Sequence, residues 1–295
     1  MKVHKERAFS IYHPIVSFTY FLIVIIASMF FMHPVFIAIS LVCSVIYASL
    51  LDEDKTEKIF LFGLMTALGI AIINVIFVHR GATVLFYLRE NPVTFESLMY
   101  GVCSGGMMLS VVLWFSCYNE IITSEKFLYI FGRLVPSIAL MISMTLRLIP
   151  KLINQTKIIA ASQKTMGLDC SSGPWIKRAK SSMRILSILV TWALEDGVET
   201  ADSMKARGYG LKGRTNFSIF VFTKRDGIML AFIIIITIIL GVGYLMGISS
   251  LRFYPKIARI PFNFKSIVVY VAFFSLGIMP SLLEIMEDIK WKQLK

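Results

Sequence analysis

The stretch GIMLAFIIIITIILGVGYLMGI, residues 227–248, decides the fold class, because it contains 22 consecutive residues without a charged side chain. A transmembrane α-helix needs about 20 mainly apolar residues, since each residue rises about 1.5 Å through a hydrocarbon core of about 30 Å. The composition agrees: of 295 residues, 57% are hydrophobic and 16% are charged, and the mean hydropathy is +0.75. These values exclude a soluble domain and predict an integral membrane protein.

Further stretches on both sides of this one predict more transmembrane helices. Only His33 separates the first two stretches, residues 14–32 and 34–51. Pro34 after it favours a tight helical hairpin near the membrane surface. The fold class predicted from this pattern is an all-α integral membrane protein with about six transmembrane helices. The five further stretches are residues 14–32, 34–51, 59–78, 97–122 and 265–285.

The charged residues predict how the chain is oriented. It carries 30 Lys and Arg against 18 Asp and Glu, a formal net charge of +12. Nucleic-acid binding is a poor explanation, because the aromatic residues lie mostly inside apolar runs. With a cytoplasmic N-terminus, 24 of the 30 basic residues fall on the cytoplasmic side and 6 on the other. We therefore expect a multi-pass protein of a prokaryotic cell membrane, with the N-terminus and the C-terminus in the cytoplasm.

One long segment, residues 123–226, collects 16 of the 30 basic residues. We predict three domains: an N-terminal membrane domain of four spans (1–122), a cytoplasmic helical domain (123–226), and a C-terminal membrane hairpin of two spans (227–295). Within the cytoplasmic domain, residues 134–150 are apolar but contain Arg147. We expect a helix along or beneath the bilayer there, and the sequence leaves its depth open. Part of the basic charge is expected to hold the domain against the anionic inner leaflet.

Two long helices are predicted in this cytoplasmic domain, and each ends at a glycine. The first follows Pro150 and stops at Gly167, and the second runs over about 176–206 and stops at Gly208. Glycine enters the left-handed conformation that terminates a helix without a steric penalty from Cβ. Arg207 precedes the second glycine, and its guanidinium is a planar fork suited to a carboxylate of another protein.

The second helix end carries a resemblance to a known family. Residues 199–210, ETADSMKARGYG, followed by LKGRT at 211–215, resemble the Ala-Arg-Gly signature of the transmembrane T component of energy-coupling factor transporters. Residues 143–150, SMTLRLIP, are similar to the stretch that opens the coupling domain of that family. The resemblance covers most of the chain, and the second helix carries nearly all its specificity.

This resemblance implies a non-catalytic subunit of a vitamin or metal-ion importer. The implied partners are two cytoplasmic ABC ATPases, which bind the ATP and Mg, and a small substrate-binding membrane protein, the S component. The chain itself would hold no cofactor. The family's two coupling helices rest their Ala-Arg-Gly ends in grooves of the ATPases. In this sequence the signature falls on Ala206, Arg207 and Gly208.

The first coupling motif is degenerate, and it falls on Lys164, Thr165, Met166 and Gly167. Methionine stands where arginine is expected, and a thioether makes no charge-assisted hydrogen bond. Either this contact is apolar, or Lys164 supplies a substitute cation, although lysine does not reproduce the bidentate fork of arginine. We therefore predict unequal docking, with Arg207 as the stronger anchor.

Two other classes of protein are alternatives to this interpretation. The permease of a conventional ABC importer would itself form the translocation path and usually has only a short coupling loop. An integral-membrane enzyme would need a nucleophile, a metal set or an acid–base pair, and no such cluster is apparent. No Gly-x-x-x-x-Gly-Lys-Ser/Thr loop is present, so the chain is not expected to hydrolyse ATP. The cysteines predict no zinc site or disulfide framework; they are Cys43, Cys103, Cys117 and Cys170.

Two clusters leave alternatives open. The acidic group Glu195, Asp196, Glu199 and Asp202 is expected either to face solvent or to pair with Lys151, Lys157 and Lys164 of the other long helix, which would help fix how the helices cross. The small residues Gly101, Ser104, Gly105 and Gly106 predict close helix packing, either within this chain or against the substrate-binding protein.

Overall fold

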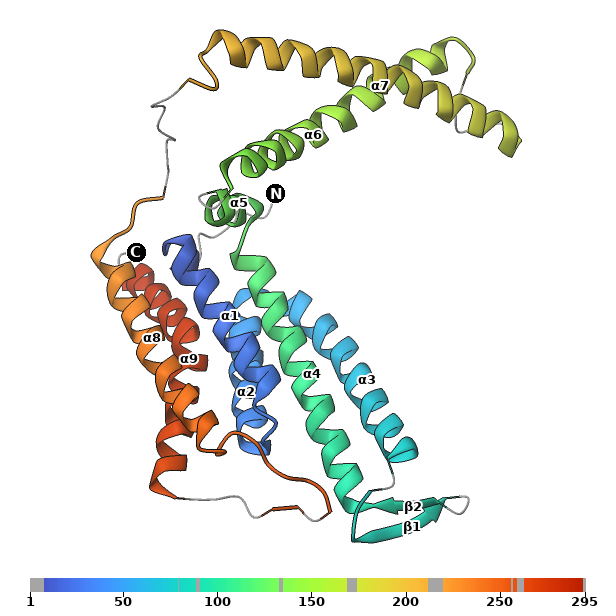
Figure 1. Ribbon diagram of the computed structural model, residues 1–295. Coiled ribbons are helices and arrows are strands. Elements are labelled where there is room, and N and C mark those ends of the chain that lie inside the picture. Colours follow the sequence, from blue (N-terminus) through green and yellow to red (C-terminus); the bar gives the residue numbers. More distant parts are fainter. Residues whose placement is uncertain are drawn as a thin grey trace. The chain divides into compact units, whose positions relative to one another are not determined.

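The computed structural model describes residues 8–78, 80–88, 91–132, 135–168, 174–211, 220–255, 257–258 and 263–293. It divides into a bundle unit, Met1–Phe127 with Phe220–Lys295, and a two-helix unit, Leu128–Ile219. The elements in chain order are η1 (Ala8–Ser10), α1 (Pro14–Phe30), α2 (Pro34–Leu51), α3 (Glu53–Phe77), β1 (Val84–Leu88), β2 (Asn91–Thr94), α4 (Phe95–Ile121), α5 (Ser124–Gly132), α6 (Pro136–Thr165), α7 (Trp175–Ala206), α8 (Lys224–Leu245) and α9 (Phe264–Gln293) (Figure 1).

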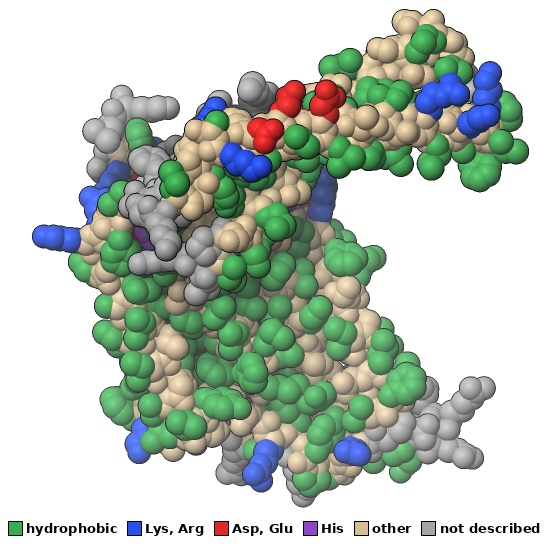
Figure 2. Space-filling view, turned by 45° about the horizontal axis from the view of Figure 1, so that its top comes forward, with side chains coloured by type: hydrophobic (Ala, Val, Ile, Leu, Met, Phe, Trp, Pro, Cys, Tyr) green, Lys and Arg blue, Asp and Glu red, His purple; other side chains and the backbone are tan. Residues whose placement is uncertain are grey.

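The bundle unit packs six helices, α1 to α4 with α8 and α9, around an aromatic core. Tyr20 and Phe21 of α1 meet Trp114 of α4 with ring centroids 6.2 and 6.5 Å apart, both edge to face. All three side chains are fully buried, and such edge-on pairs stabilise beyond the area that they bury. Figure 2 shows apolar side chains covering the visible face of this unit, with Lys and Arg toward its ends. The predicted all-α integral membrane fold is confirmed.

The described helices that are long and apolar enough to cross a membrane number six: α2, α3, α4, α6, α8 and α9. This set differs from the predicted one, because it contains α6 and omits α1, which has 17 residues. At about 1.5 Å per residue, α1 spans roughly 26 Å, the short end of the transmembrane range. Its Val16 and Val24 are buried in the bundle core. In contrast, none of the apolar window of α6 is buried, so the depth of α6 stays open.

The predicted hairpin between the first two helices is confirmed, and a repeated cap explains it. His13 precedes Pro14 and His33 precedes Pro34; each imidazole Nδ1 accepts a hydrogen bond of 3.3 Å from the backbone N–H two residues later. Proline at the first helical position has no N–H to leave unsatisfied. The same His-Pro pair therefore starts both helices and limits the connection between them to three residues.

Polar groups inside the bundle are joined to one another. The Ser40 hydroxyl of α2 lies 2.7 Å from that of Ser28 in α1 and 2.6 Å from that of Ser110 in α4. The indole N–H of Trp114 donates to the same Ser40 oxygen at 3.0 Å. A hydroxyl buried in an apolar interior is costly unless it is hydrogen-bonded, so Ser40 ties three helices together in register.

The small-residue patch of α4 makes an internal contact, which decides between the two predicted alternatives. A Cβ added at Gly105 would lie 2.6 Å from the carbonyl oxygen of Ala67 in α3, and one at Gly101 would lie 3.0 Å from that of Ala71. Only glycine allows the α3 and α4 backbones to approach this closely.

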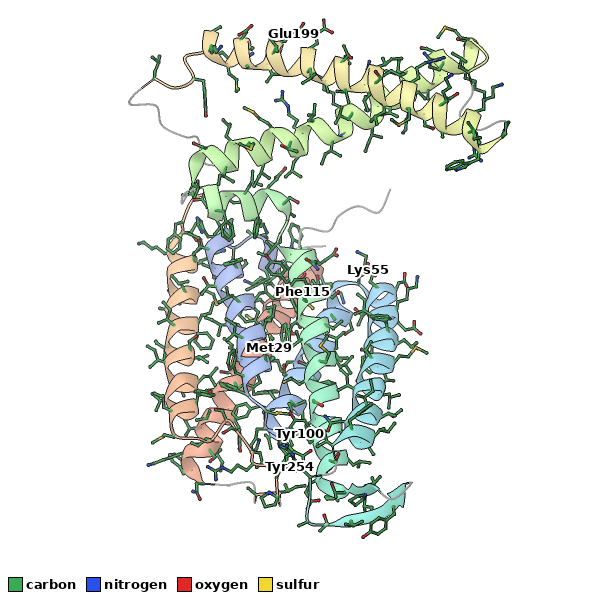
Figure 3. All side chains as sticks on the ribbon, turned by 45° about the vertical axis from the view of Figure 1, so that its right-hand side comes forward. Met29, Lys55, Tyr100, Phe115, Glu199 and Tyr254 are labelled. Atoms are coloured by element: carbon green, nitrogen blue, oxygen red, sulfur yellow. The ribbon has the colours of Figure 1, made fainter. Side chains whose placement is uncertain are left out.

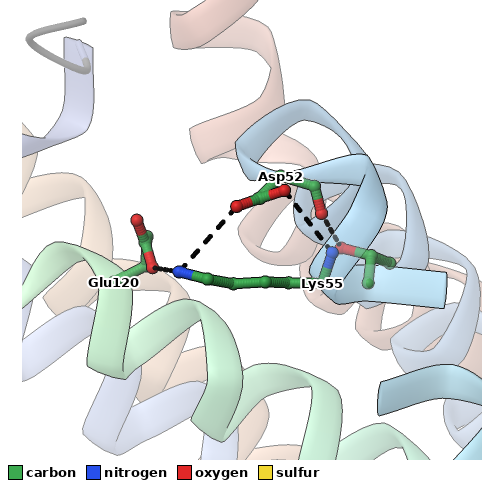
Figure 4. A network of polar contacts seen from close by, with 4 residues as sticks. Asp52, Lys55 and Glu120 are labelled. Carbon is green, nitrogen blue, oxygen red and sulfur yellow. Dashed lines mark hydrogen bonds and ion pairs between the residues drawn. The ribbon is translucent and has the colours of Figure 1, made fainter. Parts of the chain in front are cut away.

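One boundary of the bundle unit is marked by cations in defined contacts. Lys55 of α3 pairs with Glu120 of α4 at 3.1 Å and with Asp52 at 3.8 Å (Figure 4). Figure 3 places Lys55 at the end of the unit opposite to Tyr254. Near the same boundary Lys126 is buried, and its ammonium donates to the carbonyl and hydroxyl of Ser10 at 2.7 and 2.8 Å. Burial lowers the pKa of Lys126.

Two features differ from the sequence-based expectation. The antiparallel hairpin β1–β2 between α3 and α4 was not predicted, because it lies among short polar and apolar runs outside the spans. Within the predicted stretch 134–150, residues 136–150 do not form a helix of their own: α6 runs through Pro150 and continues to Thr165. A proline removes one helical hydrogen bond, which 30 residues of helix outweigh.

Candidate functional site

The predicted coupling motif lies at the C-terminal end of α7. Ala206 is the last helical residue, Arg207 is the C-cap, and Gly208 follows with φ of +75°. The N–H of Tyr209 donates to the carbonyl of Met204 at 3.0 Å, and the N–H of Gly208 donates to that of Lys205 at 2.9 Å. These two bonds define a Schellman cap, in which a left-handed glycine closes the helix and satisfies its last carbonyls.

The degenerate motif at the end of α6 has the same cap. Gly167 has φ of +72°, its N–H donates to the Lys164 carbonyl at 3.1 Å, and the N–H of Leu168 donates to the Gln163 carbonyl at 3.0 Å. Met166 occupies the C-cap position with φ −87° and ψ 10°, against −83° and 9° for Arg207. The two helix ends are therefore one structural motif used twice.

This equivalence pairs each residue of one end with a residue of the other. Met166 corresponds to Arg207 and Thr165 to Ala206, while Lys164 corresponds to Lys205. A lysine thus stands at the same position of both ends. Both alternatives for the α6 end, an apolar contact or a contact through Lys164, stay predictions.

Sequence reasoning missed a signal that predicts this correspondence. Residues 160–167 and 201–208 both follow the pattern Ala-x-Ser-x-Lys-x-x-Gly, with four identities in eight positions. Aligning the two glycines shows the duplication without a structure, and it agrees with the resemblance, which already places Met166 at the arginine position.

Both helix ends present their side chains to the surroundings. Met166 is 62% exposed and Tyr209 is 49% exposed, while Arg207 is also exposed. Leu211, beyond the second cap, is 72% exposed; residues 212–215 of the predicted signature lie outside the described residues. One end offers the guanidinium of Arg207 and, two residues later, the ring of Tyr209, and the other offers a thioether.

Contacts between α6 and α7 fix the separation of the two ends. Ile159 and Gln163 of α6 and Ser181 and Ile185 of α7 are the buried residues of this pair. Figure 1 shows the helices crossing, with their C-terminal ends on opposite sides of the crossing. These buried residues lie two to six residues before the end of α6 at Thr165 but 21 to 25 residues before the end of α7 at Ala206.

An ion pair joins α6 and α7. It decides between the two alternatives predicted for the acidic group of α7, which were exposure to solvent and pairing with lysines of the other long helix. The Lys151 ammonium of α6 binds the Asp196 carboxylate of α7, and it also lies 5.3 Å from the centroid of the Trp192 ring. The predicted pairing between the long helices is confirmed for Asp196. Asp202 instead pairs with Lys205 of its own helix at 3.7 Å.

Reversing Asp196 is expected to loosen the crossing. In Asp196→Lys the new ammonium faces Lys151, and because the original pair is partly exposed its loss costs about 1 kcal/mol. Spin labels at Ser162 and Ser203, in a variant without native cysteines, should show a broader distance distribution. The double variant Lys151→Asp/Asp196→Lys should restore it, and Glu199→Lys on the same helix should leave it narrow. Equal broadening by Glu199→Lys would contradict a role for the pair.

Side chains that could bind a metal ion are dispersed in the described part of the chain. There, no three His, Cys, Asp or Glu side chains gather in a way that could hold a metal ion. Cys43, Cys103 and Cys117 are buried and form no disulfide among the described residues, and Cys170 lies outside the described ranges. The candidate site therefore consists of the two helix ends and the crossing that separates them.

The fold and these two ends define a class: a multi-pass helical membrane protein carrying a separate unit of two capped helices. The family described as "CbiQ: Cobalt transport protein" matches residues 13–219, more than two thirds of the chain. The chain therefore belongs to this family of EcfT/CbiQ-like transmembrane components of energy-coupling factor transporters.

Similar curated proteins share one description, "Energy-coupling factor transporter transmembrane protein EcfT". The protein of Listeria innocua is 31% identical over 229 residues, which cover 70% of this chain and 85% of the relative. That of Brevibacillus brevis is 32% identical over 178 residues, or 56% and 67% of the two chains. That of Lactobacillus helveticus is 39% identical over 112 residues, or 38% and 40%. All are described as transporter subunits, which agrees with a non-catalytic role.

Proposed function

We propose that this chain transmits the motion of two cytoplasmic ATPases to a small substrate-binding membrane protein. The ATPases would bind ATP and Mg, and the chain would hold no cofactor. The ends of α6 and α7 would contact one ATPase each, in line with the resemblance of Ala206, Arg207 and Gly208 to the family signature. Uptake of a vitamin or a metal ion is the proposed outcome.

The observation that carries this proposal is the duplicated helix end. Two equivalent caps, Met166-Gly167 and Arg207-Gly208, lie on opposite sides of one crossing, and the C-cap side chains of both are exposed. A pair of equivalent contacts matches a pair of ATPases, since each subunit would meet the same backbone geometry. The crossing held by Lys151 and Asp196 would let a movement at one end reach the other as a rotation of two rigid helices.

The remaining surface of the two-helix unit supports a further contact. Leu194 and Val198 follow one face of α7 and are 68% and 63% exposed. Large apolar side chains as exposed as these mark a surface that a partner or the bilayer covers. We propose that the substrate-binding protein contacts this face. We also propose that both chain termini lie in the cytoplasm.

Co-purification distinguishes the proposed function from the alternative, a conventional permease that forms the translocation path itself. The tagged chain, co-expressed with two ATPases and a small substrate-binding membrane protein from the same cell, is expected to retain all three through size-exclusion chromatography. The purified chain alone is expected to bind neither cobalt nor a vitamin. Saturable binding of the transported substrate by the chain alone would reject the proposal and favour the permease.

A further inference from the structure

A cavity of about 550 Å³ opens in the bundle unit where α8 begins and α9 ends. Its lining comes from η1 and the turn after it, from residues 221–226, and from the last turns of α9. The helix ends that form it lie side by side in Figure 1. The volume falls in the range of pockets that hold a small ligand, and the two coupling ends take no part in it.

This cavity lies at a boundary between apolar and aqueous surroundings. The charged residues of α8 are confined to Lys224, Arg225 and Asp226, its first three positions, and the helix then continues uncharged to Leu245. The carboxylates of α9 fall in its final third. A bilayer boundary therefore passes through this level of the unit, with the apolar lining residues Leu283 and Met286 next to it.

Three cations line the cavity: Lys224, Arg225 and Lys290. All three are exposed, and in the described part of the chain none of them forms an ion pair. Two carboxylates also line it. Asp226 is 3% exposed and already accepts hydrogen bonds from the backbone of His13 and from Thr223 at 2.7 to 2.9 Å, so it is occupied within the fold. Glu287 is the other carboxylate.

The N-terminus of α8 is not itself the binding group here. Thr223 and Asp226 form a capping box, which satisfies N–H groups of the first turn within the chain. Recognition in this cavity would come from side chains on two helices. Tyr12 adds a hydroxyl donor; burial raises its pKa, which Arg225 partly opposes, so the hydroxyl stays protonated at neutral pH.

We propose that this cavity binds the headgroup of an acidic phospholipid. The phosphodiester would lie among Lys224, Arg225 and Lys290, while the glycerol and the upper acyl chain would cover Leu283 and Met286. Basic pockets between transmembrane helices are suited to anionic headgroups, and each basic residue near the membrane surface strengthens such binding about fivefold. This site is independent of the ATPase contacts proposed above.

A lipid titration of the full-length chain in detergent tests the proposal, read by native mass spectrometry as occupancy of the first bound lipid. Phosphatidylglycerol is expected to bind at least tenfold more tightly than phosphatidylcholine with the same acyl chains. Arg225→Gln/Lys290→Gln should weaken phosphatidylglycerol binding by roughly 30-fold, the product of two charges. Glu287→Gln should tighten it, because it removes the carboxylate that opposes the phosphate.

Lys58→Gln is the matched control, since Lys58 is an exposed cation in the first turns of α3 and does not line the cavity. Its binding should equal that of the unaltered chain. Equal binding of the two lipids, or equal weakening by Lys58→Gln, would overturn the proposal. Saturation of the site by inorganic phosphate alone would assign it to a soluble anion instead. Loss of the lipid on assembly with the partner subunits would assign the cavity to a protein contact.

Discussion

Gly105→Leu is expected to abolish the folded bundle, and Gly105→Ala to destabilise it. Any side chain at this position begins with a Cβ 2.6 Å from the carbonyl oxygen of Ala67 and 3.1 Å from its carbonyl carbon. These are backbone atoms of α3, so no side-chain rotation relieves the overlap, and the two helices must separate. Overpacking of a well-packed contact costs about 1–3 kcal/mol, and leucine at this closest approach is expected to exceed that range.

The chain supplies graded controls for this prediction. At Gly106 an added Cβ would lie 3.2 Å from a methyl group of Ile37, which can move, and at Gly69 of α3 nothing lies within 4 Å. Unfolding temperatures in detergent should therefore fall most for alanine at 105, less at 106, and not at 69. Gly69→Leu should leave a monodisperse, folded protein. A Gly69→Leu variant as damaged as Gly105→Leu would show that leucine itself, and not the α3–α4 contact, is responsible.

Hydropathy predicts which helices exist better than where they end. The predicted span 59–78 corresponds to α3, which begins six residues earlier at Glu53. Asp52 caps this helix, and its first turns are charged, so they lie outside any apolar window. For the same reason α9 extends past the predicted end at 285 to Gln293. Caps and amphipathic turns depend on local hydrogen bonds, which an average over apolarity does not register.

The candidate site was predictable in part. Glycine after the last periodic residue predicted both helix ends, because only the left-handed conformation closes a helix in this way. The equivalence of Met166 and Arg207 was also present in the sequence as the repeated Ala-x-Ser-x-Lys-x-x-Gly pattern. The sequence did not determine which acidic residue would hold the crossing. Asp196 meets Lys151 because of how α6 and α7 pack, which is a tertiary property.

Arg207→Glu is expected to abolish association with the ATPases, and this prediction rests on the proposed function. Arg207 is the C-cap of α7 and Gly208 still terminates the helix, so the substitution alters the chemistry of the exposed end and not its backbone. Glutamate would repel the carboxylate that an arginine contact requires, and it would add negative charge at the negative end of the helix dipole. Breaking a buried charged contact costs about 2–5 kcal/mol, or roughly 30-fold or more in affinity.

The matched variants separate the two ends. Met166→Ala removes a thioether at the equivalent position and should weaken co-purification of the ATPases only slightly. Met166→Arg should strengthen it, because it gives the α6 cap the guanidinium that the α7 cap already presents. Arg184→Glu, the same charge reversal at an exposed position of α7 far from the cap, should change nothing.

The contrast between these variants tests the unequal docking that the two caps predict. The backbone dihedral angles of the C-caps agree within 4° in φ, so a difference in binding must arise from the side chains at 166 and 207. Arg207→Lys keeps the charge but loses the bidentate fork. Its affinity for the ATPases is expected to lie between those of the unaltered chain and of Arg207→Glu. Equal losses from Met166→Ala and Arg207→Glu would mean that the shared cap, and not the guanidinium, determines binding.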